Sequence, residues 1–345
     1  MKTRRLVLIG VGNIGKRLLQ MLTDKQKTLE EQYGVRLQLV GVADSGGAVF
    51  HDQGLDCAEL LNCKLGGKSV STCPGHGLPG VSGLELLQRD RADLLVELSP
   101  TNLKHGEPGL SLITWALSNG VDVVTANKGP MVLAYQHLTE LAREQQRSLM
   151  FSATVTGGLP TLNLGRRDLV GARIDRVEGI FNTTTNYILC RMDKAGLSLA
   201  DALTEAQKAG VAEADPTLDI DGWDAANKLV IVANAVLHMP ATLQDVCVQG
   251  IRGLDRSDLI KARDRGRVVK LLVTAELQQE GGYALSVRPT ELLLSHPMAS
   301  LTEWQMGVVF TTDIMGVITA VIDDEGPTAT TGAVLRDVLN TALQR

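Results

Sequence analysis

Residues 6–15 read LVLIGVGNIG, a short apolar run that leads directly into a glycine-rich turn. An unbroken run of branched apolar residues is typical of a strand buried in a parallel sheet, and a helical pattern follows over residues 14–31. Glycines at such a turn let the chain bend tightly, let a pyrophosphate approach the backbone and let the helix pack closely on the strand. The stretch predicts a dinucleotide-binding turn, and a plain strand-to-helix connection is the alternative. The residues expected to contact the cofactor are Gly10, Gly12, Asn13, Ile14 and Gly15.

Strand and helix patterns alternate through the first 150 residues. Apolar runs predict further strands at 37–43, 93–98 and 121–125, and apolar periodicity predicts helices at 109–119 and 134–147. Such alternation is typical of the α/β class, in which helices cover both faces of a mostly parallel sheet. We therefore expect a doubly wound, Rossmann-type domain over residues 1–150.

The pattern changes after Phe151. Extended stretches are predicted at 174–181, 283–288, 307–312 and 315–322, and helices at 198–209 and 222–238. This mixture predicts a second, α+β domain over residues 151–330. A final helical pattern at 331–343, with the chain end to residue 345, is expected to pack back on the first domain.

The composition narrows the classes of function. The chain has 345 residues, more than the ~150 that one domain usually holds. A net charge of −5 gives no basic surface for nucleic acid, so we expect no nucleic-acid partner. The longest apolar stretches fall short of the ~20 residues of a membrane span, so we expect no membrane partner either. Five cysteines cannot all pair within one chain, and no export cleavage site follows the basic start. A reducing, cytoplasmic location is therefore expected.

Asp44 ends the second predicted strand, where a dinucleotide site places the adenosine ribose. A carboxylate there can accept bonds from the ribose hydroxyls of NAD, whereas the 2′-phosphate of NADP needs a cation. The next basic residue in sequence is Lys64, twenty positions later, although a distant one such as Lys104 could reach the phosphate. These observations favour NAD over NADP. The alternative is a solvated aspartate in the turn formed with residues 45–47.

The densest charged segment is residues 213–228, EADPTLDIDGWDAANK, in which five carboxylates precede a lysine. We expect Asp221 to be the N-cap of a helix that places Asp224 and Lys228 four positions apart on one face. A carboxylate pair can hold a substrate ammonium group, and a lysine in a partly dry cleft can exchange a proton with an alcohol or aldehyde oxygen. An exposed salt bridge at the helix start is the alternative. A calcium loop is discounted because the carboxylate order differs from that of an EF-hand.

Three further segments place polar residues at turns. Residues 125–128, TANK, follow a predicted strand at the carboxyl edge of the sheet, where such folds bind ligands, so we expect Lys128 near the nicotinamide. Residues 153–160 and 181–186 are rich in small and hydroxyl side chains. They suit contacts with a polar ligand, but ordinary turns have the same composition.

The cysteines carry no predicted chemistry. Cys57, Cys63, Cys73 and His76 do not have the spacing of a common zinc site, so no metal is assigned. Cys190 and Cys247 are expected to be packed thiols, which disfavours aldehyde oxidation through a thioester.

Taken in order, GVGNIG, TANKGP, SATVTGGLP, EGIFNTTTNYIL and AEADPTLDIDGWDAANKL resemble the homoserine dehydrogenase family over residues 5–255. The resemblance implies hydride transfer between a nicotinamide cofactor and the aldehyde of L-aspartate 4-semialdehyde, which gives L-homoserine. This reversible step belongs to threonine and methionine biosynthesis, and the family implies a homodimer formed by the second domain.

The resemblance also assigns roles to individual residues. Lys128 and Lys228 match two lysines near the reacting oxygen, with Lys228 as the proton carrier, and Glu213 and Asp224 match carboxylates that hold the substrate. The other assigned residues are Asp219, Thr183 and Gly157 for the substrate, and Thr125 and Asn127 for the cofactor.

The sequence departs from the family pattern at four places. Thr183 and Thr156 stand where the family has glycine, and Ser152 stands where it often has glutamate beside a monovalent-cation site of backbone carbonyls in residues 152–159. Residues 323–332 replace a turn rich in glycine and alanine. These changes leave two alternatives open, a non-catalytic paralogue that senses a dinucleotide and an amino acid, and a dehydrogenase of another small amino or hydroxy acid. We expect neither an ACT domain nor an aspartate kinase domain.

Overall fold

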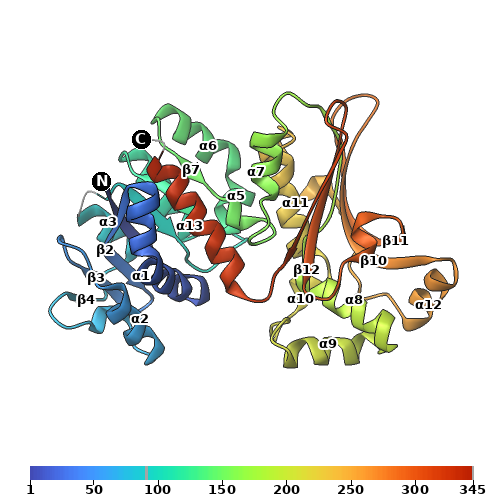
Figure 1. Ribbon diagram of the computed structural model, residues 1–345, viewed down its shortest axis with the longest axis horizontal. Helices are drawn as coiled ribbons and strands as arrows, with labels where there is room; N and C mark the ends of the chain where they lie inside the picture. Colours follow the sequence, from blue (N-terminus) through green and yellow to red (C-terminus); the bar gives the residue numbers. More distant parts are fainter. Residues whose placement is uncertain (90–91, 344–345) are drawn as a thin grey trace. The chain divides into compact units, whose positions relative to one another are not determined.

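The structure, a computed structural model, describes residues 1–89 and 92–343 (Figure 1). The chain forms two compact units, of which unit 1 comprises Met1–Gly157 and Pro327–Arg345 and unit 2 comprises Gly158–Gly326. Residues 344–345, the end of the predicted last helix, lie outside the described residues. Within the described ranges, no helix is both long and apolar enough to cross a membrane.

Unit 1 contains a seven-stranded sheet of order β4-β3-β2-β1-β5-β6-β7. Its strands are β1 (Lys2–Ile9), β2 (Val35–Asp44), β3 (Gly47–Phe50), β4 (Gly77–Pro79), β5 (Leu94–Glu97), β6 (Asp122–Thr125) and β7 (Leu149–Met150). The neighbours from β2 to β7 are parallel, whereas β3 and β4 are antiparallel additions at one edge. The expected doubly wound α/β fold is confirmed, and the parallel strands direct their carboxyl ends to a common edge.

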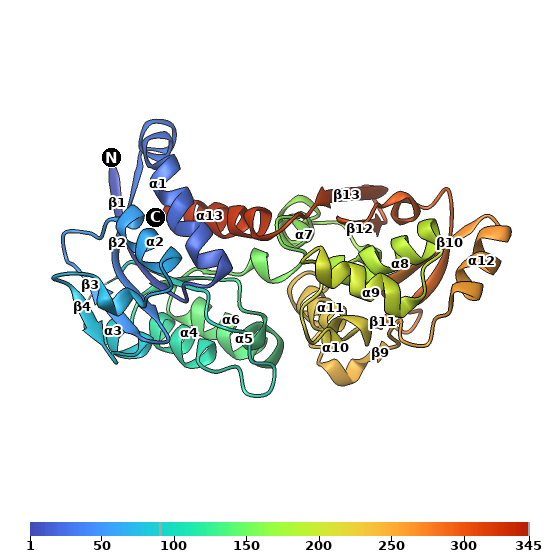
Figure 2. The same ribbon diagram turned by 90° about the horizontal axis from the view of Figure 1, so that it is seen from below.

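Helices cover both faces of this sheet (Figure 2). On one face α1 (Asn13–Tyr33) packs against α13 (Pro327–Leu343), and on the other are α3 (Gly83–Arg89), α4 (Gly109–Ser118) and α6 (Tyr135–Glu144). The fully buried Asp337 of α13 accepts hydrogen bonds from the Ser152 backbone nitrogen at 2.9 Å and its hydroxyl at 2.6 Å. The last helix of the chain is therefore part of the core of unit 1.

The connection between β2 and β5 contains structure that the sequence patterns do not predict. Strands β3 and β4 are only a few residues long, and α2 (Cys57–Leu65) begins at Asp56, whose side chain caps it through the backbone nitrogens of Ala58 and Glu59. Such short elements in a glycine-rich segment show no apolar periodicity. They form because they pair with strands that are distant in sequence, so the local pattern does not predict them.

Unit 2 is built on a six-stranded sheet of order β13-β12-β8-β10-β11-β9. Its strands are β8 (Ile174–Ile180), β9 (Val246–Val248), β10 (Arg267–Leu277), β11 (Tyr283–Leu293), β12 (Gln305–Thr312) and β13 (Val317–Asp323). Its helices are α7 (Thr161–Asn163), α8 (Thr183–Ala195), α9 (Leu199–Lys208), α10 (Thr217–Ile220), α11 (Trp223–Ala235) and α12 (Arg256–Asp264). The adjoining strands are antiparallel except β9 and β11. This is the expected α+β architecture.

Unit 2 contains several elements that the sequence patterns do not predict, and two of them, α8 and β10, bear on the site. The polar run expected to be a turn at 181–186 begins α8 instead, because the Asn182 side chain accepts a hydrogen bond from the Thr185 nitrogen at 2.8 Å and caps the helix. Strand β10 is not predicted, since Lys270 interrupts its apolar run.

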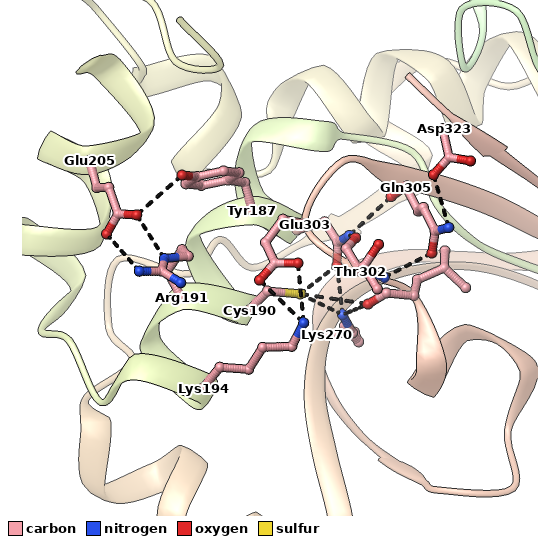
Figure 3. Close-up of polar contacts among 12 residues, drawn as sticks. Tyr187, Cys190, Arg191, Lys194, Glu205, Lys270, Thr302, Glu303, Gln305 and Asp323 are labelled. Atoms are coloured by element: carbon pink, nitrogen blue, oxygen red, sulfur yellow. Dashed lines mark hydrogen bonds and ion pairs between the residues drawn. The ribbon is translucent and has the colours of Figure 1, made fainter. Parts of the chain in front are cut away.

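Lys270 is 4% exposed and lies among polar groups from two segments, α8 and the chain around Leu301 (Figure 3). Its Nζ donates to Asn186 Oδ1 of α8 and to the Leu301 carbonyl, both at 2.8 Å, and lies 3.1 Å from the Cys190 sulfur. The Asn186 amide in turn donates to the Thr302 carbonyl at 2.6 Å. These bonds fasten α8 to β10 and to the segment that precedes β12.

Candidate active site

The glycine turn follows β1 directly and opens α1, as predicted. A side chain on Gly10 would lie 2.2 Å from the Leu98 carbonyl oxygen, and one on Gly15 would lie 2.3 Å from the Gly10 carbonyl oxygen. At Gly12 a side chain would meet no protein atom within 4 Å, and Gly12 is the N-cap of α1 without a side-chain cap. The first and third glycines thus serve backbone packing. The second leaves open space at a helix N-terminus, which fits a pyrophosphate.

A cavity of about 480 Å³ adjoins this turn at the carboxyl ends of β1, β2 and β5. Gly10, Asp44, Ser45 and Ser99 line it, with further residues from 80–84 and 108–112. Ligands of open parallel sheets bind at this edge, where the strand order reverses. The cavity therefore fits the adenosine side of a dinucleotide.

Asp44 is held more firmly than its sequence context predicts. Its side chain is 8% exposed and accepts hydrogen bonds from Lys64 Nζ at 2.6 Å, Ser69 Oγ at 2.6 Å and the Val70 nitrogen at 3.0 Å. Burial acts to raise the pKa of Asp44, but these bonds prevail and hold it below its ordinary value. The alternative of a solvated aspartate is wrong, and Lys64 lies beside Asp44 despite the distance between them in sequence.

Glu97, which sequence reasoning missed, lies beneath the predicted cofactor residues. It is fully buried at the end of β5 and accepts hydrogen bonds from the Ser99 hydroxyl, the Ser99 nitrogen at 2.8 Å and the Thr125 hydroxyl at 2.9 Å. Burial raises the pKa of Glu97 above its ordinary value, although the Ser99, Thr125 and Asn127 bonds oppose the rise. Glu97 is thus the common acceptor of donors from the residues after β5 and from the end of β6.

The same network reaches Lys128. Asn127 donates through its backbone nitrogen to Thr125 Oγ1 at 2.9 Å and through its amide to Ser99 Oγ at 3.3 Å. Its Oδ1 accepts from the Gly129 nitrogen at 3.0 Å and caps α5 (Lys128–Leu133). Lys128 is therefore the first residue of a helix whose start is fixed by the carboxyl ends of two strands.

The predicted pair of Asp224 and Lys228 forms on α11. Lys228 Nζ lies 2.8 Å from Asp224 Oδ2 and donates to the Phe181 carbonyl at 2.5 Å. The Lys228 side chain is 13% exposed and the Asp224 side chain is 11% exposed, so the alternative of an exposed salt bridge is wrong. A lysine with a carboxylate and a carbonyl as neighbours, and with little water, is suited to proton exchange with a ligand.

Asn182 organises the carboxylates around this lysine. Its amide donates to Asp219 Oδ1 at 2.7 Å and to Asp224 Oδ2 at 2.9 Å. Burial and the neighbouring charge of Asp224 raise the pKa of Asp219 above its ordinary value. Two carboxylates therefore share one amide donor in a site of net negative charge, which can hold a cation such as a substrate ammonium group.

Two predicted residues of this segment lie elsewhere. Asp221 is not the N-cap of α11, because Gly222, with a φ of 84°, occupies that position. Asp221 instead pairs with Arg252 at 2.8 Å on the surface. Glu213 is exposed, and in the described part of the chain its carboxylate makes no hydrogen bond with Asp224 or Lys228.

The remaining predicted residues lie at the ends of local elements. Thr183 is the first residue of α8, next to Asn182. Thr156 and Gly157 both have left-handed φ values, of 51° and 56°. Glycine adopts this conformation without strain, which gives a physical reason for the glycine that the family has in place of Thr156.

Comparisons with known proteins agree with this arrangement. Residues 160–339 match the family described as homoserine dehydrogenase, and residues 10–152 match its NAD-binding domain. The homoserine dehydrogenase of Methanocaldococcus jannaschii is 35% identical over 97% of both chains. The NAD(+)-dependent homoserine dehydrogenase of Pseudomonas canavaninivorans is 35% identical over 97% of this chain and 95% of that protein.

Solved structures give the same result. A putative homoserine dehydrogenase from Archaeoglobus fulgidus has a TM-score of 0.87 and is 32% identical over 98% of each chain. A hyperthermophilic archaeal homoserine dehydrogenase in complex with NADPH has a TM-score of 0.85 and is 26% identical over 99% of this chain and 98% of the other. With a glycine turn that fits a dinucleotide in one unit and a shielded lysine among carboxylates in the other, the chain belongs to the homoserine dehydrogenase family.

Proposed function

We propose that the protein catalyses the reversible oxidation of L-homoserine to L-aspartate 4-semialdehyde with a nicotinamide cofactor. The observation that carries the proposal is the Lys228 site, in which a shielded ammonium group is anchored by Asp224 and the Phe181 carbonyl. A bound nicotinamide supplies or accepts the hydride, and the residues of the chain bind the substrate and move the proton.

Lys228 is the proposed proton carrier. Homoserine must lose its hydroxyl proton as its carbon loses hydride, and a neutral Lys228 can accept that proton. In the reverse direction the ammonium group donates a proton to the aldehyde oxygen. Phe181 and Asp224 engage two of the three N–H groups and so orient the third. Lys128, at the start of α5, is proposed as a second lysine near the reacting oxygen.

The carboxylates are proposed to hold the substrate ammonium group. Asp219 and Asp224 are favoured for this contact over Glu213, because Asn182 fixes both of them whereas Glu213 is exposed. Thr183 and Gly157 are proposed to contact the same substrate. Gly10, Gly12, Asn13, Ile14, Gly15, Asp44, Thr125 and Asn127 are proposed for the cofactor.

NAD is proposed as the preferred cofactor. Asp44 lines the cavity and carries its negative charge, which suits the ribose hydroxyls of NAD and opposes a 2′-phosphate. Lys64 offsets part of that charge, so the preference for NAD depends on the net effect of the Asp44 and Lys64 charges.

Purified protein, L-homoserine and each cofactor in turn provide the test, with nicotinamide absorbance as the readout. Turnover with homoserine supports the proposal. Cofactor binding without turnover of any small hydroxy or amino acid would instead support a sensor, and turnover of another acid alone would change the substrate.

A homodimer in the cytoplasm, serving threonine and methionine biosynthesis, completes the proposal. The edge strand β13 carries exposed apolar side chains, including Val317 at 62% exposure and Val321, which suit burial against a second copy. Light scattering of the purified protein measures the mass in solution, and a monomer would contradict this part.

A further inference from the structure

Lys270 of β10 and Cys190 of α8 bring an amine and a thiol into contact inside unit 2 (Figure 3). The Lys270 Nζ atom lies 3.1 Å from the Cys190 sulfur. Lys270 is 4% exposed and Cys190 is 5% exposed, and Cys190 is a free cysteine. The proposed dehydrogenase reaction uses neither residue, so the contact between them has no role in that chemistry.

Two oxygen atoms hold the amine against the sulfur. Nζ donates to Asn186 Oδ1 and to the Leu301 carbonyl oxygen, both at 2.8 Å. The Cys190 sulfur faces the same two oxygens, at 3.8 Å from Asn186 Oδ1 and 3.6 Å from the Leu301 oxygen. A neutral amine has two N–H groups and one lone pair. Because the two oxygens accept both N–H groups, the lone pair is directed to the remaining neighbour, which is the sulfur.

The charges around the pair permit this neutral form. Among the described residues no carboxylate pairs with Lys270, whose acceptors are the two oxygens and the sulfur. A buried ammonium group without a negative partner is costly, which favours either an amine beside a thiol or an ammonium group beside a thiolate. Both states have no net charge and differ in the position of one proton. The thiolate is the form that reacts with oxidants, and the amine is the form that attacks an oxidised sulfur.

We propose that Cys190 and Lys270 form a covalent nitrogen–sulfur crosslink on reaction with a peroxide. The thiolate attacks one peroxide oxygen and becomes a sulfenic acid, while the O–O bond breaks and the leaving hydroxide takes the ammonium proton to form water. The amine lone pair then attacks the sulfur, the S–O bond breaks, and the second hydroxide takes an amine proton to form another water. The sulfur loses two electrons and the peroxide gains two. A thiol reductant returns two electrons to the sulfur and restores both side chains.

The crosslink joins α8 covalently to β10. Helix α8 begins at the Asn182 cap, whose amide donates to Asp219 and Asp224, and Cys190 lies about two turns later on the same helix. The linked residues are 80 positions apart in sequence. A covalent link over such a separation restricts the unfolded chain, as a disulfide does. The oxidised protein is therefore expected to unfold at a higher temperature than the reduced protein.

The first test treats the purified protein with hydrogen peroxide, digests it with trypsin without reduction and maps the peptides by mass spectrometry. The peptide that contains Cys190 should be joined to a peptide in which Lys270 is uncleaved, because trypsin does not cleave after a modified lysine. The joined mass should be about 2 Da below the sum of the two peptides, and dithiothreitol should separate them. A joined mass about 14 Da above the sum also supports the crosslink, since a second peroxide then leaves one oxygen between the same nitrogen and sulfur.

Three variants identify the atoms that react. Cys190→Ser should abolish the joined peptide, because it removes the sulfur and keeps Lys270 with its two oxygen acceptors. Lys270→Arg should also abolish it, because a guanidinium group stays charged and is not a nucleophile. Cys247→Ser is the matched control, since it removes an exposed thiol and should leave the crosslink unchanged. Circular dichroism establishes that the variants are folded.

The second test measures thermal unfolding before and after peroxide treatment. The unfolding midpoint of the wild type should rise by roughly 3 °C or more and return after dithiothreitol, whereas that of Cys190→Ser should not rise. A joined peptide without a higher midpoint would contradict the stabilising effect of the crosslink.

Two results of the peptide map overturn the crosslink itself. One is oxidation of Cys190 to a sulfinic or sulfonic acid without a joined peptide, and the other is a Cys190 that stays reduced while the exposed Cys247 is oxidised. None of these measurements requires homoserine or a cofactor, so they test the crosslink separately from the proposed function.

Discussion

Unit 2 contains two shielded lysines in opposite surroundings. Lys228 faces carboxylates and is 13% exposed, whereas Lys270, at 4%, contacts an amide oxygen, a carbonyl oxygen and a thiol sulfur (Figure 3). A lysine among carboxylates, at a site that a ligand can reach, can pass its proton on. A lysine enclosed by backbone and amide acceptors instead satisfies polar groups that the core would otherwise leave unpaired. Burial alone therefore does not identify a catalytic lysine, and the chemistry of its acceptors separates the two cases.

The largest expected effect is on activity, through Lys228. Lys228→Met should lower kcat for homoserine oxidation by about two orders of magnitude or more, since the general acid–base group is lost. Cofactor affinity, measured by fluorescence titration, should stay within a factor of about two, because the proposed role is in proton transfer. If the substitution lowered cofactor affinity as much as kcat, Lys228 would have no specific role in proton transfer, and the contrast with Lys270 would be wrong.

Lys270 should show the opposite behaviour. Lys270→Met removes the lysine donor from Asn186 Oδ1 and the Leu301 carbonyl and leaves them only the weak Cys190 thiol, so the free energy of unfolding should fall by about 2–4 kcal/mol. Turnover per folded molecule should stay near that of the wild type. Urea titration measures the loss, with the exposed Lys261→Met as control. An unchanged stability would show that these acceptors find other donors and that Lys270 is not structural.

Glu97 extends the comparison to a buried carboxylate in unit 1. Its pKa is raised in the folded state, so wild-type stability decreases as the pH rises from the ordinary glutamate range through that raised pKa. Glu97→Gln lacks this dependence, so the advantage of the wild type should be largest at acid pH and shrink toward neutral pH. Urea titrations across that range measure the difference. A difference that grows with pH would mean that the folded state favours the charged form.

Lys64 is intermediate between Lys228 and Lys270, because it pairs with a single carboxylate, Asp44, at the edge of the cavity. Asp44→Ser should lower the NAD-to-NADP ratio of kcat/KM by about tenfold, since the carboxylate that opposes a 2′-phosphate is removed. Lys64→Met should change the ratio in the other direction by a smaller factor. Ratios equal to that of the wild type in both variants would remove Asp44 from cofactor selection, and a wild-type preference for NADP would contradict the cofactor proposal.

The parts of the site that follow from the sequence are local. The glycine turn depends on a strand and a helix that are adjacent in sequence, and the Asp224–Lys228 pair depends only on helical spacing. Both are present in the structure. The expected Asp221 cap failed for the same local reason, because Gly222 starts the helix with a left-handed residue.

The parts of the site that the sequence does not reveal depend on contacts between residues that are far apart in the chain. Lys64 reaches Asp44 only through the short helix α2, and Glu97 gathers donors from two strands that become neighbours when the sheet forms. Strand β10 is not predicted because Lys270 interrupts its apolar run. Only the structure shows that acceptors on other elements allow this lysine to be buried within a strand.

Helix α13 has a consequence for the order in which the molecule is completed during synthesis. Unit 1 needs α13, whose Asp337 holds Ser152, yet α13 follows every residue of unit 2 in the chain. On the ribosome, all of Gly158–Gly326 emerges before the cofactor unit has its last core helix. Unit 2 is therefore the first whose residues are all available, and the unit that matches an NAD-binding domain stays incomplete until α13 has been made. A chain released before α13 would contain all of unit 2 and lack a finished unit 1.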